Sequence, residues 1–367
     1  MTTEFARQLI KNILSDLSNC HPDNFDDERF PEKFPGTVSD PELVEQLDLA
    51  GLENTYNLLA DERSKQLLVK LIEYKLLGWE KVILPTNTPE FWKWRKTIPA
   101  LIEEQDVRTI KFGGWKLSRF NLSGIGFPIR LEYVPLGILA TFCSKQYEYN
   151  NVSPPIKVRE SDIVIDAGGC WGDTALYFAS MAGSRGRVYT FEFIPSNLEI
   201  MRANLNLNDA LSPNITIVEN PVWSQSDQTL FCIDNGPGSR VSSQRLSSDD
   251  ITMKTVSIDD FIERRQLDRV DFIKMDIEGA ELATLKGAEQ VLRKFRPQLA
   301  VSVYHRPEDL VEIPRYLASL DLGYEFYLGH HTIHLEETIL YARTKHEGIS
   351  RGRWLENMKT YLRGSNS

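Results

Sequence analysis

Residues 163–174, Ile-Val-Ile-Asp-Ala-Gly-Gly-Cys-Trp-Gly-Asp-Thr, constrain the fold of this chain more than any other segment. The apolar start predicts a short buried strand, the glycines predict a tight turn, and a helix is expected after Gly172. A second predicted strand, at 187–192, ends in the acidic Glu192. Strands that alternate with helices predict an α/β fold with a doubly wound, mostly parallel sheet. In such a sheet a ligand binds outside the carboxyl ends of the strands, so the glycine turn marks a candidate ligand site.

The glycine turn departs from the pattern that binds dinucleotides. Gly-x-Gly-x-x-Gly needs a first glycine where this chain has Ala167, and only Gly169 and Gly172 match the pattern. Asp173 is predicted to cap the next helix, and its negative charge would oppose a pyrophosphate there. A cationic cofactor without phosphate fits better, and S-adenosylmethionine is such a cofactor.

Three segments resemble the FkbM family of methyltransferases: the glycine turn, residues 191–197 (Phe-Glu-Phe-Ile-Pro-Ser-Asn) and residues 270–281 (Val-Asp-Phe-Ile-Lys-Met-Asp-Ile-Glu-Gly-Ala-Glu). The similarity extends from about residue 162 to about residue 342, and the last segment is the most specific. Many members carry Gly-Ala-Asn-x-Gly where residues 168–172 of this chain are Gly-Gly-Cys-Trp-Gly. The resemblance implies the Rossmann-like class I methyltransferase fold, with seven strands and the last antiparallel. It also implies S-adenosylmethionine as the cofactor and methyl transfer to a hydroxyl group.

The candidate cofactor residues share a place at a strand's carboxyl end or in the turn that follows. They are Asp166, Gly168, Gly169, Gly172, Glu192, Phe193, Asn220, Val222 and Asp276. Gly168 and Gly172 have no Cβ and would let the backbone approach the ligand. Glu192 is expected to accept hydrogen bonds from both ribose hydroxyls, and Asp166 to orient the methionine end. By analogy, the residues after the third strand are expected to meet the adenine.

The candidate catalytic residues follow the fourth and fifth predicted strands. Asp276 and Glu278 flank a turn, where they could hold the sulfonium and remove a proton from an attacking hydroxyl. His305 follows the fifth strand and could accept that proton near neutral pH. Glu278 could instead be a solvent-facing acid at a helix start, and His305 a hydrogen-bonded core residue. The three side chains are also metal-ligand types, but their spacing carries no metal signature, and no metal is predicted.

Short signals predict where several helices begin and end. Asp61 can cap a helix over 61–77, and Ser196 and Glu199 match a Ser-x-x-Glu capping box. The apolar residues between 282 and 292 lie on one face of a single predicted helix.

Two polar segments lie between predicted strands. His330, His331 and His334 miss the standard zinc spacings, so a solvated hairpin loop is predicted there rather than a metal cluster. Residues 234–252 are polar and glycine-rich and interrupt the pattern of strands and helices. Within them, residues 235–240 suit either a mobile lid over the acceptor or an ordinary flexible loop.

The composition excludes several classes of function. The net charge of −10 disfavours nucleic acid as a partner, because phosphate binding needs clustered Lys and Arg. The longest apolar stretch, residues 134–143, is too short to cross a bilayer, and the first 17 residues lack the order of a signal peptide. The 4 cysteines have no paired spacing, which is typical of reduced thiols. We therefore expect a soluble, cytoplasmic protein without membrane contact.

Three parts are predicted along the chain. Residues 1–155 form an N-terminal accessory module, helical and then mixed with strands, which could recognise the acceptor. Residues 156–345 form the FkbM-like methyltransferase domain, and residues 346–367 form a C-terminal tail. A Pro-Pro pair at 154–155 marks the first boundary.

The predicted function is S-adenosylmethionine-dependent O-methylation of a small-molecule hydroxyl on a sugar or a secondary metabolite. An NAD(P)-dependent oxidoreductase would share the first strand-turn-helix unit. A non-catalytic S-adenosylmethionine-binding or scaffold protein would share the whole fold. A homo-oligomer is left open.

Overall fold

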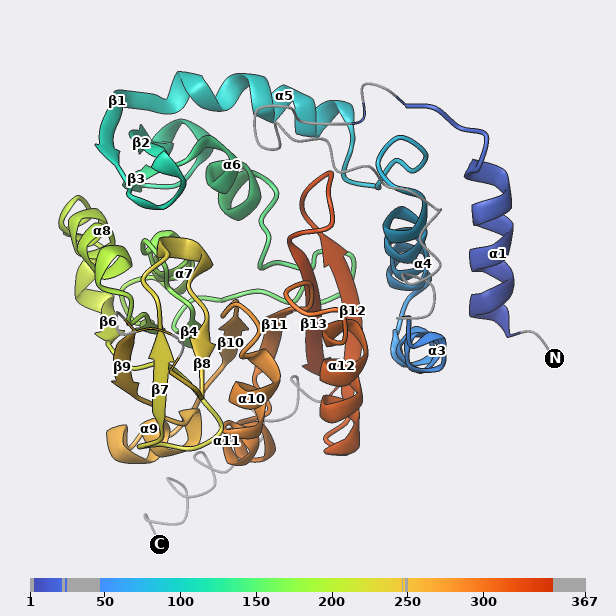
Figure 1. The fold of residues 1–367 in the computed structure, drawn as a ribbon. Coiled ribbons are helices and arrows are strands. Elements are labelled where there is room, and N and C mark those ends of the chain that lie inside the picture. Colours follow the sequence, from blue (N-terminus) through green and yellow to red (C-terminus); the bar gives the residue numbers. More distant parts are fainter. Residues whose placement is uncertain (1–2, 22–23, 25–46, 246, 248–249, 346–367) are drawn as a thin grey trace, which may run out of the picture.

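A computed structural model describes residues 3–21, 24, 47–245, 247 and 250–345 of the 367-residue chain. Its centre is a seven-stranded sheet in the order β12-β13-β11-β10-β4-β5-β6 (Figure 1). The strands are β4 (Ile163–Ala167), β5 (Arg187–Phe191), β6 (Ile215–Val218), β10 (Phe272–Met275), β11 (Gln298–Ser302), β12 (Tyr324–His330) and β13 (Thr338–Thr344). β13 pairs antiparallel with both β11 and β12, and the other neighbouring strands of this sheet pair parallel. The mostly parallel sheet with one antiparallel strand confirms the predicted fold class.

Both faces of the sheet are buried, as parallel strands require. In β4, Val164 packs into one hydrophobic layer and Ile165 into the opposite one, because successive side chains of a strand alternate between faces. Residues of α7 and α8 share the layer of Val164, and residues of α9 to α12 share the other. These helices are α7 (Asp173–Ala182), α8 (Pro195–Asn206), α9 (Ile258–Arg265), α10 (Glu281–Lys286), α11 (Glu289–Phe295) and α12 (Asp309–Ser319).

The N-terminal elements pack in two places (Figure 1). Three helices lie beside β12 and α12: α1 (Glu4–Asp16), α3 (Leu49–Leu58) and α4 (Glu62–Leu77). The remaining elements surround a small antiparallel sheet on the side of α7 and α8: α5 (Pro89–Thr97), β1 (Ile102–Thr109), β2 (Lys116–Asn121), β3 (Arg130–Tyr133) and α6 (Pro135–Ile138). The domain boundary at residue 155 stays a prediction, and the expected tail at 346–367 lies outside the described residues. Among those residues, no helix combines the length and apolar character that crossing a membrane demands.

The polar segment after β6 contains strands that the sequence analysis did not predict. A separate antiparallel sheet forms in the order β8-β7-β9, from β7 (Thr229–Cys232), β8 (Val241–Ser242) and β9 (Ile251–Lys254). These strands have 2 to 4 residues each, and their alternation is too brief to stand out within a polar sequence. The sheet carries residues 236–241 to the edge of the cavity described below.

The three histidines of the β12–β13 hairpin are buried, so the predicted solvated loop is wrong. Nε2 of His331 lies 2.8 Å from the hydroxyl of Tyr341, and burial lowers the pKa of this histidine to about 4. Nδ1 of His334 lies 3.5 Å from the hydroxyl of Tyr74 on α4. The hairpin is buried because N-terminal residues pack over it, a long-range contact that its own polar sequence does not encode.

Candidate active site

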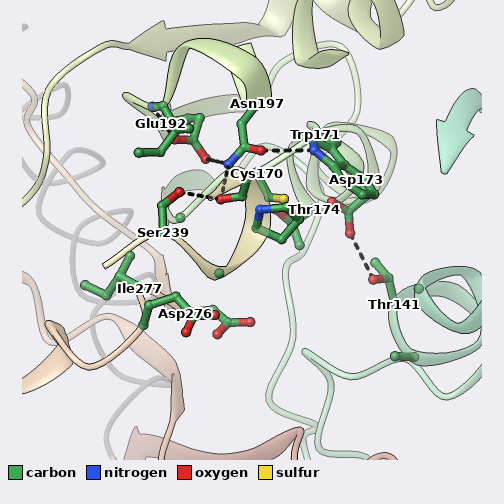
Figure 2. Close-up of a pocket in the computed structure, with 18 of the residues that line it drawn as sticks. Thr141, Cys170, Trp171, Asp173, Thr174, Glu192, Asn197, Ser239, Asp276 and Ile277 are labelled. Carbon is green, nitrogen blue, oxygen red and sulfur yellow. Dashed lines mark hydrogen bonds between the residues drawn. The ribbon is translucent and has the colours of Figure 1, made fainter. Parts of the chain in front are cut away.

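A cavity of about 730 Å³ opens at the carboxyl ends of β4, β5 and β10. Figure 2 shows its wall, with side chains from the glycine turn, from α8 and from the segment after β10. The predicted residues that line it are Gly168, Glu192, Phe193, Asn220, Val222, Asp276, Glu278 and His305. Asp166, Gly169 and Gly172 are predicted site residues that lie behind this wall.

The packing of the backbone explains why glycines occupy the turn after β4. Gly168 has a φ of +88°, and a Cβ there would lie 1.9 Å from the carbonyl oxygen of Asp276. A Cβ on Gly169 would lie 2.0 Å from Oγ1 of Thr190, and Gly172 has a φ of +84°. The turn can therefore lie directly against β5 and the exit of β10.

Asp166 is fully buried beneath the turn. Its Oδ2 accepts hydrogen bonds of 2.9 Å from the hydroxyls of Thr174 and Thr190, and its Oδ1 lies 3.2 Å from Nζ of Lys274. Nζ of Lys274 also donates to the carbonyl of Gly168 at 2.5 Å, and Lys274 lines the cavity. The sequence analysis gave Lys274 no role, although a lysine inside an apolar strand was a usable signal. Asp166 reaches the cavity through Lys274, so the geometry favours a positioning role.

Glu192 is held at the cavity by its own backbone and by α8 (Figure 2). Its Oε1 accepts hydrogen bonds from the backbone N–H of Phe193 at 2.6 Å and of Ile194 at 2.8 Å, and its Oε2 accepts one from Asn197 at 3.2 Å. Burial raises the pKa of Glu192 to about 7, although these donors act against the shift. A carboxylate has about four acceptor positions, so capacity remains for a ligand hydroxyl. Asn197, which also accepts from the indole N–H of Trp171 at 3.0 Å, was missed as a site residue.

Asp173 does not cap α7 as predicted. Gly172 occupies the cap position, and no side chain makes a capping hydrogen bond there. The carboxylate of Asp173 instead accepts a hydrogen bond of 3.0 Å from the hydroxyl of Thr141, which belongs to the N-terminal part (Figure 2). Burial raises the pKa of Asp173, and the charge of Lys274 opposes that shift. The result is a second buried carboxyl on the cavity wall.

The segment after β10 and the end of β11 bring three carboxyl groups around His305. Nδ1 of His305 lies 2.8 Å from Oε1 of Glu281, the first residue of α10. Nε2 of His305 lies 3.2 Å from Oδ1 of Asp276 and 3.7 Å from Oε1 of Glu278. Burial alone would lower the pKa of His305, but Asp276 and Glu281 outweigh it and raise that pKa to about 11. A histidine that is already protonated at neutral pH is a poor proton acceptor.

Two tyrosines also contact Asp276. The hydroxyl of Tyr147 donates to Oδ2 at 2.9 Å, and the hydroxyl of Tyr304 donates to Oδ1 at 3.4 Å. Burial would raise the pKa of Asp276, but the hydrogen bond and charge of His305 outweigh burial and hold this pKa well below its usual range. Asp276 is therefore a fixed negative charge at the carboxyl end of β10.

Glu278 differs from Asp276 in its surroundings. Its backbone has a φ of +54°, uncommon for a residue with a Cβ, and the turn continues through Gly279 at +97°. Burial raises the pKa of Glu278, Asp276 adds to the shift, and His305 opposes it. Arg240 of the segment 236–241 lies 3.6 Å from its carboxylate. The structure thus places a firmly ionised acid and an acid with a raised pKa beside the same cavity.

The cavity has the charge and the shape that a cationic nucleoside cofactor requires. Three lysine or arginine side chains line it, those of Arg95, Arg240 and Lys274, and Lys274 pairs with the buried Asp166. Acidic side chains outnumber them, and the acids on the wall are Asp173, Glu192, Asp276, Glu278, Glu336 and Glu337. The backbone of Gly168 lies on the cavity wall, and an added Cβ there would clash with the carbonyl oxygen of Asp276. The residues present therefore fit S-adenosylmethionine, whose sulfonium and ammonium groups are positive.

Known proteins that resemble this chain are methyltransferases, which agrees with a cavity that fits S-adenosylmethionine. Residues 162–326 match the family model of the methyltransferase FkbM domain. A curated relative, the hexuronic acid methyltransferase AglP of Haloferax volcanii, is 22% identical over 170 residues, which cover 46% of this chain and 66% of the relative. The match therefore spans slightly less than two thirds of that relative's length.

Similarity to solved structures is also low. The methyltransferase FkbM from Methylobacillus flagellatus KT has a TM-score of 0.49 and 22% identity, over 82% of this chain and 60% of that one. The O-methyltransferase from Bacillus cereus in complex with SAH has a TM-score of 0.35 and 14% identity, over 58% of this chain and 82% of that one. Because both TM-scores are below 0.5, the fold is assigned from the strand order and not from these similarities.

The sheet and its cavity define a class I methyltransferase fold. Residues 162–326 match the FkbM methyltransferase domain, which confirms the resemblance predicted from the sequence. A methyltransferase domain with this cavity supports S-adenosylmethionine as the cofactor, as predicted.

Proposed function

We propose that this protein transfers the methyl group of S-adenosylmethionine to a hydroxyl group of a small-molecule acceptor, with a sugar as the favoured class. The observation that carries the proposal is the pair Asp276 and Glu278, whose surroundings shift their pKa values in opposite directions beside one cavity. Such a pair supplies a permanent negative charge and a proton acceptor.

Different residues of the cavity suit different parts of the cofactor. Glu192 accepts hydrogen bonds from the ribose hydroxyls of the cofactor. The buried carboxylate of Asp173 faces the positive ammonium group. Phe193 and Val222 offer apolar wall to the adenine, and Asn220 stands beside them. The sulfonium supplies an activated methyl group, so the chain has to align the acceptor and remove its proton.

Glu278 takes the role of proton acceptor in this proposal. Its raised pKa brings it closer to the operating pH, and Asp276 remains ionised beside the sulfonium. His305 was a candidate base from the sequence, but the carboxylates on both ring nitrogens keep it protonated. His305 fits better as a positioning residue that holds the carboxyl groups of Asp276 and Glu281 in place.

The acceptor side of the cavity is built by the N-terminal part of the chain. Trp115, Tyr133 and Gln146 line it together with Arg95. Aromatic and polar side chains in one concave wall suit a sugar ring with several hydroxyls. The similarity to a protein named as a hexuronic acid methyltransferase favours the same class.

The test begins with calorimetric titration of S-adenosylmethionine into the wild type, Glu192→Ala and Glu219→Gln. Glu219 follows β6, is exposed and pairs with Arg202 outside the cavity, so it is the matched control. Micromolar binding that is lost only in Glu192→Ala is expected. A screen of neutral and acidic sugars with labelled methyl donor then identifies the acceptor.

The alternatives give different results in the same assays. Binding of a nicotinamide cofactor without S-adenosylmethionine would establish an oxidoreductase. Tight S-adenosylmethionine binding without turnover on any acceptor would favour a scaffold protein. Loss of methyl transfer in Glu278→Gln, with cofactor binding retained, would exclude both.

A further inference from the structure

We propose that residues 234–240 form a strap that holds Arg240 against Glu278, which makes Arg240 a positioning residue for the proposed proton acceptor. The strap lies between β7 and β8, and residues 236–240 of it line the cavity. The sequence left a mobile lid and an ordinary flexible loop open for this segment. In the structure the strap contacts α8 at one end and Glu278 at the other.

The first anchor of the strap is the beginning of α8. Oδ2 of Asp234 accepts the backbone N–H of Ser196 at 3.2 Å, and Oδ1 accepts the Ser196 hydroxyl at 2.5 Å. The N–H groups in the first turn of a helix have no partner within the helix, and Ile194 at the cap position supplies no side-chain hydrogen bond. Asp234 therefore caps α8 from outside the helix.

Asn197 connects the strap to the proposed ribose acid. Its Nδ2 donates to the carbonyl of Gly236 at 3.3 Å and to Oε2 of Glu192 at 3.2 Å (Figure 2). Within the strap, the hydroxyl of Ser239 donates to the same carbonyl at 2.7 Å and accepts the N–H of Asn235 at 2.9 Å. These hydrogen bonds close the strap into a defined turn beside α8.

The other end of the strap places Arg240 at Glu278. Nε of Arg240 lies 3.6 Å from Oε2 of Glu278, and both side chains line the cavity. The Arg240 side chain is 66% exposed and that of Glu278 is 28% exposed. An ion pair with so much solvent contact contributes little to stability. Its effect is therefore on the position and the charge of Glu278 rather than on the fold.

Four charged side chains act on the Glu278 carboxyl group. Burial raises its pKa, and the charge of His305 opposes that shift. Asp276 raises the pKa further, Arg240 lowers it, and Glu281 raises it. His305 is held between Asp276 and Glu281, whereas Arg240 comes from the strap and can be replaced without altering that group. Removal of the positive charge of Arg240 should therefore raise the pKa of Glu278.

The positioning role of Arg240 rests on the proposed function, because it assumes that Glu278 accepts the proton of the acceptor. A proton acceptor has to be ionised at the working pH. Without Arg240 a larger fraction of Glu278 is protonated near neutral pH. Methyl transfer should then fall on the acid side of its pH profile and recover at higher pH.

Carbon NMR of the full chain, with glutamate labelled at the side-chain carboxyl carbon, tests the contact without any acceptor. The Glu278 signal is the one that Glu278→Gln lacks. In Arg240→Gln we expect its titration midpoint about 0.5–1 pH unit above that of the wild type, the effect of one charge about 4 Å away in a solvated site. Arg240→Lys keeps a positive charge and should restore part of the difference.

Arg245→Gln is the matched control for Arg240→Gln. Arg245 lies over the ring of Phe231, on the same side of the chain sequence but outside the cavity lining. The variant loses the same charge, and its Glu278 midpoint should equal that of the wild type.

Asp234→Ala tests whether the strap holds Arg240 in place. Loss of the negative charge of Asp234 would by itself lower the midpoint of Glu278. Release of the strap would raise the midpoint instead, because Arg240 would move away from Glu278. We expect a rise toward the value in Arg240→Gln, so the sign of the shift separates the two effects.

An unchanged Glu278 midpoint in Arg240→Gln overturns the proposal, and so does a fall or no change in Asp234→Ala. Both substituted side chains are exposed, and circular dichroism checks that each variant is folded. Titration of S-adenosylmethionine into the same samples separates the two proposals. Absence of cofactor binding in the wild type would contradict the proposed function, whereas the midpoints would still report on the strap.

Discussion

In the proposed function, burial of the Glu192 carboxyl group makes cofactor affinity depend on pH. An ionised carboxylate can accept hydrogen bonds from both ribose hydroxyls, whereas a protonated carboxyl group is uncharged and has fewer acceptor positions. Because its pKa is raised to about 7, Glu192 becomes fully ionised only above neutral pH. S-adenosylmethionine affinity should rise about 10-fold between pH 6 and pH 8, as calorimetry at each pH would show.

The ammonium group of the cofactor also titrates in this range, so a control is needed. Glu192→Gln keeps the size of the side chain and removes its titration. Affinity in that variant should be lower at pH 8, and between pH 6 and pH 8 it should keep only the dependence that comes from the ammonium group. An equal pH dependence in the wild type and the variant would show that Glu192 is not the responsible group.

Tyr147 belongs to the N-terminal part of the chain and contacts Asp276 of the proposed catalytic centre. Its hydroxyl donates to Asp276 at 2.9 Å, and its ring lies 5.4 Å from Nζ of Lys274. Tyr147→Phe removes one hydrogen bond to a charged group, an effect of about 1.5–3 kcal/mol. We expect kcat to fall about 10-fold or more while the S-adenosylmethionine Kd changes little, as steady-state kinetics and calorimetry would show.

Tyr149→Phe is the matched control for that variant. The hydroxyl of Tyr149 donates to the carboxylate of Asp61 at 2.5 Å, away from the cavity wall. This variant should lose stability and keep its kcat. Similar kcat losses in both variants would indicate a structural effect of the hydroxyl rather than action on Asp276.

At the scale of elements, Gly287 divides the helix that the sequence predicted as one. The apolar pattern from 282 to 292 runs through α10 and α11, but the two helices are separate. A Cβ on Gly287 would lie 2.1 Å from the carbonyl oxygen of Trp223. The break is therefore set by a backbone that packs against the glycine, which the helical periodicity cannot encode.

Gly287→Ala should destabilise the protein by about 1–3 kcal/mol, because backbone has to shift to make room for the methyl group. Urea unfolding measures this loss. Gly124→Ala serves as the control, since its Cβ would meet nothing closer than 3.7 Å. If Gly287→Ala is as stable as the control, the backbone at Trp223 can move aside without a measurable cost in free energy.

Caps were predicted with mixed success. Asp61 caps α4 as expected, because its Oδ1 accepts the backbone N–H of Ser64 at 2.8 Å. The capping box at Ser196 and Glu199 is wrong. Ser196 bonds to Asp234 of the segment after β7, and Glu199 pairs with Arg108 on β1. A capping pattern in the sequence does not form a cap where a distant segment provides hydrogen-bond or ion-pair partners for the same side chains.

Across the whole molecule, Asn204 joins the N-terminal sheet to the glycine turn. It is fully buried on α8, where it accepts the backbone N–H of Glu132 at 2.6 Å and donates to the carbonyl of Trp171 at 2.9 Å. Asn204→Ala leaves these buried backbone groups unsatisfied, at a cost of about 1–3 kcal/mol each. We expect lower stability in urea and weaker S-adenosylmethionine binding, because the turn loses its support.

Asn206→Ala is the matched control two residues along the same helix, where the side chain is exposed. It should leave both stability and cofactor affinity unchanged within error. Unaltered cofactor affinity in Asn204→Ala would mean that the N-terminal sheet does not support the turn.

The sequence by itself determined the fold class, the family and the positions that end each strand at the cavity. These follow from local patterns, because strand and helix periods, glycine turns and the segment at 270–281 lie within short stretches of chain. Glu192, Asp276, Glu278 and His305 all line the cavity as expected, since parallel strands deliver their carboxyl ends to one edge.

The tertiary structure alone decided what those residues can do. Asp166 pairs with Lys274 behind the wall, Asp173 bonds to Thr141, and Glu281 joins His305. Each partner comes from another part of the fold, so no spacing predicts it. Protonation depends on burial and on charges within a few ångströms, and both exist only after distant segments have packed together.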